Sequence, residues 1–246
     1  MFTLITGAEV YDPAPRGRVP VLLGRERLER VGGEVDADAI RRAGFACEHV
    51  DGSGLLLLPG LVDPHAHLIG TGGEQGFKSR TSDIPLEELV SSGITTVVGC
   101  LGTDDSTRTM PALVARARQL TRCGITAYVY TGSFHLPPPT LTGSVRNDLL
   151  FIPEVLGVGE VAIADFRSTE PSGRALAQLV SDAKVGGLLG EKVGLVHFHV
   201  GPGKRRLGAL TELLVRTKLP PQTDQRLRDI VAHAQREGAK PQAIDL

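Results

Sequence analysis

Apolar segments alternate with amphipathic segments over most of the chain, and this alternation predicts an α/β architecture. Short runs rich in β-branched residues predict strands at residues 61–68, 95–100, 126–130, 158–164 and 193–200. Apolar residues at helical spacing predict helices at residues 86–92, 110–123, 149–156, 173–184 and 207–217. About five βα units are therefore visible, as expected of a parallel sheet or barrel, whereas a complete barrel has about eight.

The first 58 residues follow a different pattern and predict a small β-rich segment. Its β-like runs are residues 2–5, 19–23, 27–31 and 49–50, separated by turn residues. A short helix is expected at residues 36–43, with Asp36 as its cap. We expect this segment, residues 1–58, to be structural and to precede a barrel domain formed by residues 59–246.

The charge balance and the apolar content narrow the classes of partner. With 27 basic and 28 acidic residues the net charge is -1, which gives no electrostatic basis for binding nucleic acid or an anionic membrane. No apolar run approaches the roughly 18 residues that a membrane-spanning helix needs, and the start lacks the basic region of a secretory signal. Cys47, Cys100 and Cys123 have no metal-ligand spacing. They predict reduced thiols in a cytoplasmic protein, and Cys100 is expected to be a small buried hydrophobe. The charge balance, by contrast, favours a small-molecule partner.

Histidines and a carboxylate gather where predicted strands end. His65 and His67 lie two residues apart, so in a strand both side chains point the same way and could bind one metal ion. Glu160 lies in the fourth predicted strand, and His197 and His199 lie near the end of the fifth. The residues alone leave ordinary alternatives open. A histidine here could be a hydrogen-bonded residue of the core or rim, and Glu160 could be a surface carboxylate.

The run Pro59-Gly-Leu-Val-Asp-Pro-His-Ala-His67 resembles the first-strand signature of the amidohydrolase superfamily. Its continuation to Gly76 resembles the isoaspartyl (β-aspartyl) dipeptidases, and so do residues 95–104, 130–137, 142–145, 162–168 and 185–190. The resemblance implies a partial (β/α)8 TIM-type barrel preceded by a small β-sandwich-like N-terminal segment. It also implies a metal-dependent hydrolase that cleaves the β-aspartyl amide bond of dipeptides by attack of a metal-bound hydroxide.

The resemblance also implies a set of metal ligands. His65, His67 and His199 match ligand positions. Glu160 matches a lysine that the family carries as a carbamate bridging two metals, if one extra residue is accommodated at residues 157–159. Glutamate presents a similar pair of anionic oxygens. The implied cofactor is Zn2+, one or two ions, and the ligands present favour one.

Five positions match substrate-binding residues of the family, namely Gly72, Glu74, Thr103, Phe134 and Arg167. Arg167 can hold a carboxylate by a bidentate fork, and Glu74 can accept an ammonium group. Phe134 matches a tyrosine whose hydroxyl would polarise the scissile carbonyl. Either His135 or Tyr130 supplies a donor in its place, or turnover is impaired.

The last part of the family pattern has no counterpart in residues 219–246. The family's final histidine ligand and its catalytic aspartate are not found there, so the catalytic residue is unknown. Asp224, Asp229 and Asp245 lack a strand context, and His233 is expected to face solvent. An alternative therefore stays open. The chain could be a truncated, non-catalytic member of the family that retains part of the metal and ligand site and acts through binding or assembly. The fifth strand is expected to leave an open edge, which predicts a homo-oligomer.

Overall fold

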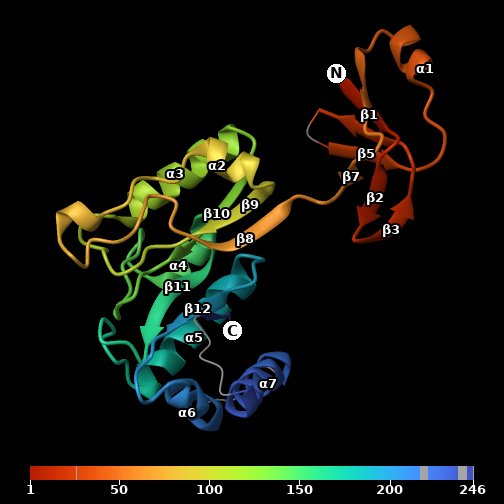
Figure 1. Ribbon diagram of the computed structural model, residues 1–246. Coiled ribbons are helices and arrows are strands. Elements are labelled where there is room, and N and C mark those ends of the chain that lie inside the picture. The colour runs from red at the N-terminus through yellow and green to blue at the C-terminus, as the bar shows by residue number, and fades with distance from the viewer. Residues whose placement is uncertain (26, 217–220, 238–242, 246) are drawn as a thin grey trace. The chain divides into compact units, whose positions relative to one another are not determined.

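The computed structural model describes residues 1–25, 27–216, 221–237 and 243–245 (Figure 1). The chain divides into two compact units, Met1–Gly60 and Leu61–Leu246. All the candidate metal-binding and substrate-binding residues lie in the second unit.

The N-terminal unit contains two small sheets. The four-stranded sheet has the order β5-β4-β1-β6 and the three-stranded sheet the order β3-β2-β7. Their strands are β1 (Phe2–Thr6), β2 (Glu9–Asp12), β3 (Ala14–Gly17), β4 (Val21–Gly24), β5 (Arg27–Val31), β6 (Cys47–Asp51) and β7 (Leu56–Leu57). The helix α1 (Ala37–Arg42) is capped by Asp36, which accepts a hydrogen bond from the Ala39 backbone N–H at 2.8 Å. The sequence missed β3 because Pro15 indicates a turn, yet β3 is an edge strand, where proline is tolerated.

The second unit is built on one six-stranded sheet with the order β13-β12-β11-β10-β9-β8. Five of its strands are parallel, namely β8 (Leu61–Ala66), β9 (Ile94–Gly99), β10 (Thr126–Thr131), β11 (Val155–Ile163) and β12 (Leu195–Val200). They form half of a (β/α)8 barrel, which confirms the predicted fold class. Each predicted strand is present, although β11 begins three residues earlier than the apolar pattern indicates.

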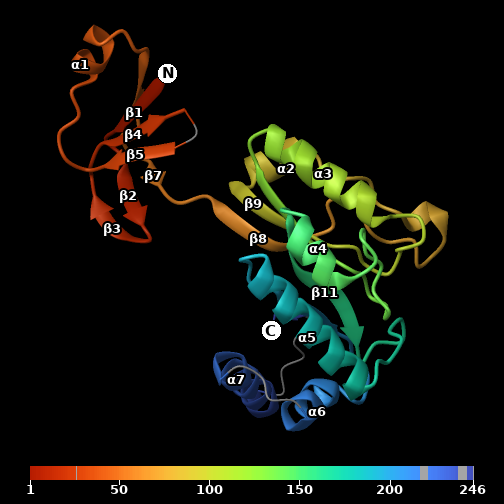
Figure 2. The same ribbon diagram turned by 180° about the vertical axis from the view of Figure 1, so that it is seen from behind.

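The first four helices of this unit cover one face of the sheet, and the last two pack one after the other against the fourth (Figures 1 and 2). They are α2 (Leu86–Ser91), α3 (Met110–Arg122), α4 (Val145–Phe151), α5 (Gly173–Leu189), α6 (Gly208–Arg216) and α7 (Pro221–Glu237), with a short 3-10 turn at Phe77–Ser79. The helix predicted at residues 149–156 was placed too late. Ser144 caps α4 by accepting a hydrogen bond from the Asn147 N–H at 3.1 Å, and Pro153 disfavours a helical conformation for the residue before it.

Strand alternation separates two sets of apolar side chains. Val97 and Val129 are fully buried in the main core together with Leu113 of α3. Val98 belongs to a second buried cluster with Cys100 and Tyr130. Residues one apart in β9 therefore face opposite sides of the sheet, as the period of two requires.

The C-terminal residues correct two expectations about the sheet. Strand β13 (Ala243–Asp245) pairs antiparallel with β12, with Asp245 opposite His197. The expectations that the fifth strand has an open edge and that Asp245 lacks a strand context were therefore wrong. They failed because three residues are too few for a periodic pattern to be visible. Self-association, which was inferred from that edge, stays a prediction.

Helix α7 follows an amphipathic pattern. Its Leu227 and Val231 are buried in the main core, whereas His233 is exposed. Within the described ranges, none of the helices has the length and apolar character needed to cross a bilayer.

Candidate functional site

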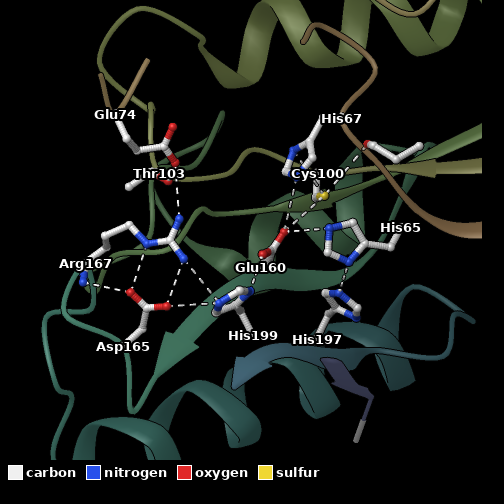
Figure 3. A network of polar contacts seen from close by, with 11 residues as sticks. His65, His67, Glu74, Cys100, Thr103, Glu160, Asp165, Arg167, His197 and His199 are labelled. Carbon is white, nitrogen blue, oxygen red and sulfur yellow. Dashed lines mark hydrogen bonds and ion pairs between the residues drawn. The ribbon is translucent and has the colours of Figure 1, made fainter. Parts of the chain in front are cut away.

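The carboxyl ends of the parallel strands bring together histidines that are far apart in the sequence. His65 lies in β8 and His67 directly follows it, Glu160 lies in β11, and His199 lies in β12. Active sites of βα barrels form at this end, because the parallel strands all finish there. Figure 3 shows the four side chains converging on one point.

Glu160 is the centre of this group. It is 2 % exposed, and its two oxygens face different histidines. Oε2 lies 2.7 Å from His65 Nε2 and 3.7 Å from His67 Nε2, whereas Oε1 lies 3.0 Å from His199 Nδ1. The carboxylate therefore lies between His65 and His67, from β8 and the loop after it, and His199 of β12.

A β-bulge places Glu160 in this position. The register between β11 and β12 shifts between Val158 and Val161, so β11 carries one more residue than β12 there. The resemblance to the dipeptidases requires one extra residue in this part of the strand, and the bulge accommodates it.

Cys100 joins the group, although the sequence indicated only a small hydrophobe. It follows β9 directly and is fully buried, with Sγ 3.6 Å from Glu160 Oε2 and 3.8 Å from His67 Nδ1. One ligand atom from each of His65, His67, Cys100 and Glu160 lies within 4.8 Å of all the others. We call these four residues the metal cluster. Two imidazoles, a thiol and a carboxylate form a donor set that suits zinc.

The pKa values in the metal cluster are shifted by burial, by hydrogen bonds from neighbouring histidines and by the charge of Glu160. Burial lowers the pKa of His67, which favours the neutral imidazole that metals bind. Burial by itself would raise the pKa of Glu160, but hydrogen bonds from His199 and His65 hold it well below its ordinary value. Burial, and then the charge of Glu160, raise the pKa of Cys100 well above its ordinary value. A metal would therefore displace a proton from Cys100 on binding.

His197 supports the metal cluster from behind. Its Nε2 lies 2.9 Å from His65 Nδ1, and its ring stacks on Tyr130 at 5.0 Å between centroids. The Tyr130 hydroxyl donates to the Pro64 carbonyl at 3.1 Å. His197 is thus a buried, hydrogen-bonded histidine of the core, as the non-metal interpretation of this position predicts. Its contact orients the ring of His65, a predicted metal ligand.

Three residues of the metal cluster, His65, His67 and Glu160, line one wall of an open cavity of about 620 Å³, whereas Cys100 is fully buried. The opposite wall carries Arg167, Glu74 and Thr103 (Figure 3). Arg167 Nη1 lies 3.2 Å from Glu74 Oε1, and the Thr103 hydroxyl donates to the same oxygen at 3.0 Å. Hydrogen bonds from its own backbone and from Thr103 lower the pKa of Glu74. The predicted cation and anion for the substrate therefore pair with each other on this wall.

Of the other predicted substrate residues, Phe134 lines this cavity and Gly72 does not. Phe134 is buried, lies under the Arg167 guanidinium at 5.0 Å and contacts His199. Gly72 lines an adjoining cavity of about 250 Å³ that shares Glu74 and Thr103. The two alternative donors are engaged outside the main cavity. Tyr130 bonds to Pro64, and His135 Nδ1 lies 2.9 Å from Asp105 Oδ2.

A buried arginine that the sequence did not single out supports the loop carrying Glu74. Arg108 is 4 % exposed and donates to the carbonyls of Ile69, Thr71 and Thr81 at 2.9, 3.0 and 3.1 Å, and to Asp104 at 2.8 Å. These bonds connect the start of the glycine-rich loop, at Ile69 and Thr71, to its end at Thr81. A sequence pattern could not reveal this role, because three of the partners are backbone carbonyls.

Comparison with known proteins gives one extensive match and several partial ones. A crystal structure of β-aspartyl dipeptidase from Fervidobacterium islandicum AW-1, in complex with β-Asp-Leu, is 42 % identical with a TM-score of 0.85 and covers 90 % of this chain. This chain spans 57 % of that one. A D-hydantoinase from Bacillus sp. AR9 is 18 % identical at a TM-score of 0.53, covering 75 % of this chain and 38 % of its own, and shares the fold alone.

Curated proteins match shorter segments. Imidazolonepropionase from Aromatoleum aromaticum is 35 % identical over 88 residues, which is 35 % of this chain and 20 % of the relative. A 5'-deoxyadenosine deaminase from Methanothermobacter thermautotrophicus is 34 % identical over 94 residues, 37 % of this chain and 19 % of the relative. This chain therefore spans about a fifth of each of these relatives. Comparison with protein-family models gives no match.

Three observations support the same family: the half-barrel, the histidines at its strand ends, and the extensive similarity to a solved dipeptidase. The signature at Pro59–His67, from which the resemblance was first inferred, lies within β8 and the residues that flank it. The chain belongs to the amidohydrolase superfamily and is close to β-aspartyl dipeptidase.

Proposed function

We propose that this chain is a metal-dependent hydrolase that cleaves the β-aspartyl amide bond of dipeptides. One observation carries the proposal: a single cavity is lined by His65, His67 and Glu160 of the metal cluster on one wall and by the Glu74–Arg167 pair on the other. The similarity to a dipeptidase crystallised with β-Asp-Leu supports the same substrate class.

The chemistry of the donors supports one zinc ion at the metal cluster. Glu160 is a buried carboxylate whose low pKa keeps it ionised, and such a charge requires a cation or hydrogen-bonding partners. His65, His67 and Cys100 complete a four-ligand set of the kind that zinc binds. A bound zinc ion would lower the pKa of a water molecule and polarise the scissile carbonyl. His199, on the other oxygen of Glu160, is the remaining predicted ligand.

The residues on the opposite wall fit the charges of a β-aspartyl group. Such a substrate carries an α-ammonium and an α-carboxylate, and we propose that these groups exchange for the Glu74–Arg167 contact. Arginine has five N–H donors. Arg167 uses Nε and Nη2 on Asp165 and Nη1 on Glu74, which leaves N–H groups for a ligand carboxylate. Glu74 stays ionised because its pKa is lowered.

Hydrolysis would add water across the amide and release aspartate and the second amino acid. To test this, the protein should be expressed with added zinc, analysed for metal content and incubated with β-Asp-Leu while released leucine is measured. We expect about one zinc per chain and leucine release from β-Asp-Leu but not from α-Asp-Leu. A chain that binds zinc and releases no leucine would support the alternative, a non-catalytic binding protein. A chain without zinc would remove the metal site.

A further inference from the structure

Asp165 contacts both walls of the cavity. It follows β11 by two residues and is 3 % exposed. Its Oδ1 accepts from Arg167 Nε and its Oδ2 from Arg167 Nη2, both at 2.9 Å, while Oδ2 also lies 3.1 Å from His199 Nε2 (Figure 3). One carboxylate therefore holds the proposed substrate arginine and a predicted metal ligand at once.

The contact with His199 extends to the metal cluster. His199 Nε2 lies 3.1 Å from Asp165 Oδ2, and its Nδ1 lies 3.0 Å from Glu160 Oε1. The ring therefore connects Asp165 to Glu160, which is one of the four residues of the metal cluster. Groups that hydrogen-bond to a metal ligand orient it, and Asp165 supports Glu160 in this way through His199.

The contact with Arg167 is a two-bond fork. The fork fixes the plane of the guanidinium and leaves its far edge directed at Glu74 and the cavity. The backbone holds Asp165 itself in place. A Cβ on Gly201 would lie 2.5 Å from the Asp165 Cβ, so the backbone just after β12 passes directly beside this side chain. A shift of the carboxylate toward one partner must therefore change its distance to the other.

We propose that Asp165 is a positioning residue that couples the two walls, so that zinc binding tightens the binding of an α-amino acid ligand and the ligand tightens zinc binding. This inference rests on the proposed function. Coupling between two sites is reciprocal, and typical couplings change affinity by about 5- to 150-fold. The coupling passes from the zinc site through His199 to Asp165 and from there to Arg167.

L-Aspartate is the probe, because it carries the α-amino and α-carboxylate groups and has no amide to be hydrolysed. Its affinity is measured by calorimetry in the metal-free and the zinc-loaded protein, and zinc affinity is measured by competition with a chelator. In the wild type, zinc should tighten L-aspartate binding at least about fivefold. In Asp165→Asn, zinc affinity should fall about 10- to 100-fold, and at saturating zinc the effect on L-aspartate should fall below about twofold.

Asp182→Asn is the matched control. Asp182 also pairs with an arginine, accepting from Arg146 Nη2 at 2.7 Å, but it lies on α5 away from the cavity walls. It should keep the wild-type zinc affinity and the wild-type coupling. A variant at Arg167 gives a second route if Asp165→Asn fails to fold. Arg167→Lys keeps the charge without the fork, so L-aspartate should bind more weakly and zinc should no longer change its affinity.

The outcomes separate this inference from the proposed function. Wild-type protein that binds neither zinc nor L-aspartate overturns both. Wild-type protein that binds each without affecting the other overturns the coupling and leaves the proposed function in place. Full coupling retained in Asp165→Asn, or in Arg167→Lys, shows that the coupling does not pass through Asp165.

Discussion

The two walls of the cavity are supported in different ways. On the metal wall, His65, Cys100 and Glu160 lie in strands or directly at their ends, so the backbone ladder of the sheet fixes their spacing. On the substrate wall, Glu74 and Thr103 lie in loops. Loops lack the backbone hydrogen bonds between strands that hold a sheet together. Here the buried Arg108 holds the loop that carries Glu74 by donating hydrogen bonds to three backbone carbonyls.

This difference indicates how each wall should respond to change. The metal wall is pre-formed and depends on its ligand atoms. The substrate wall depends on salt bridges and on one supporting arginine, and its Glu74–Arg167 contact must open for a ligand. Substitutions on one wall should therefore affect zinc or ligand affinity selectively, with Asp165 as the exception that affects both.

The largest expected effect is on the metal wall. The double substitution His65→Ala with His67→Ala removes two of the four donors of the metal cluster. We expect stoichiometric zinc to be lost, as measured by elemental analysis after dialysis. L-Aspartate affinity of this variant should match that of the metal-free wild type. Retention of one zinc per chain would show that the ion binds elsewhere.

Arg167→Met should have the next largest effect, on the substrate wall. Losing one partner of a desolvated charged contact costs about 2–5 kcal/mol, so L-aspartate binding should weaken by at least about 30-fold in calorimetry. Zinc affinity measured without ligand should change by less than about threefold, because Arg167 is not in the metal cluster. Unchanged ligand affinity would mean that the carboxylate binds another group.

Cys100→Ser tests the ligand that the sequence did not predict. We expect zinc affinity to fall about 10- to 100-fold, and the thiolate-to-metal absorption of the cobalt-substituted protein to disappear. The raised pKa of Cys100 adds a pH signature. The thiol is protonated at neutral pH, so each ion displaces one proton and wild-type zinc affinity should rise about tenfold per pH unit. The serine variant should show a shallower slope. An identical absorption spectrum would exclude Cys100 as a ligand.

The smallest expected effect comes from Arg108→Lys, which keeps the charge but cannot reach all four acceptors. Losing hydrogen bonds to a charged group costs about 1.5–3 kcal/mol each, and much of this loss should appear as lower thermal stability. L-Aspartate affinity should fall about tenfold because the Glu74 loop is less well ordered, while zinc affinity should remain within about threefold. Equal losses of zinc and ligand affinity would show that Arg108 supports the metal wall as well as the substrate wall.

The sequence was most informative where a periodic pattern coincided with a chemical one. The apolar runs predicted the five parallel strands, and the spacing of His65 and His67 predicted two convergent rings. It was least informative where partners come from another part of the chain. Cys100 joins the metal cluster from a neighbouring strand, so no spacing along the chain marks it. The short strands β3 and β13 were missed because few residues, or a proline, conceal the period.

The two contacts of Asp165, with Arg167 and with His199, could not both be predicted from the sequence. The motif Asp165-Phe-Arg167 indicates a carboxylate near an arginine, but the contact with His199 depends on the register of β11 against β12. Such a contact can be read only once two strands are paired.

We propose that one cavity binds both a metal ion and an α-amino acid ligand. This is tested by crystals of the zinc-loaded protein grown with L-aspartate and measured at the zinc absorption edge. We expect one anomalous peak among His65, His67, Cys100 and Glu160, and L-aspartate density with its α-carboxylate on Arg167 and its ammonium on Glu74. A zinc peak away from these four residues, or L-aspartate bound outside the cavity, would contradict it.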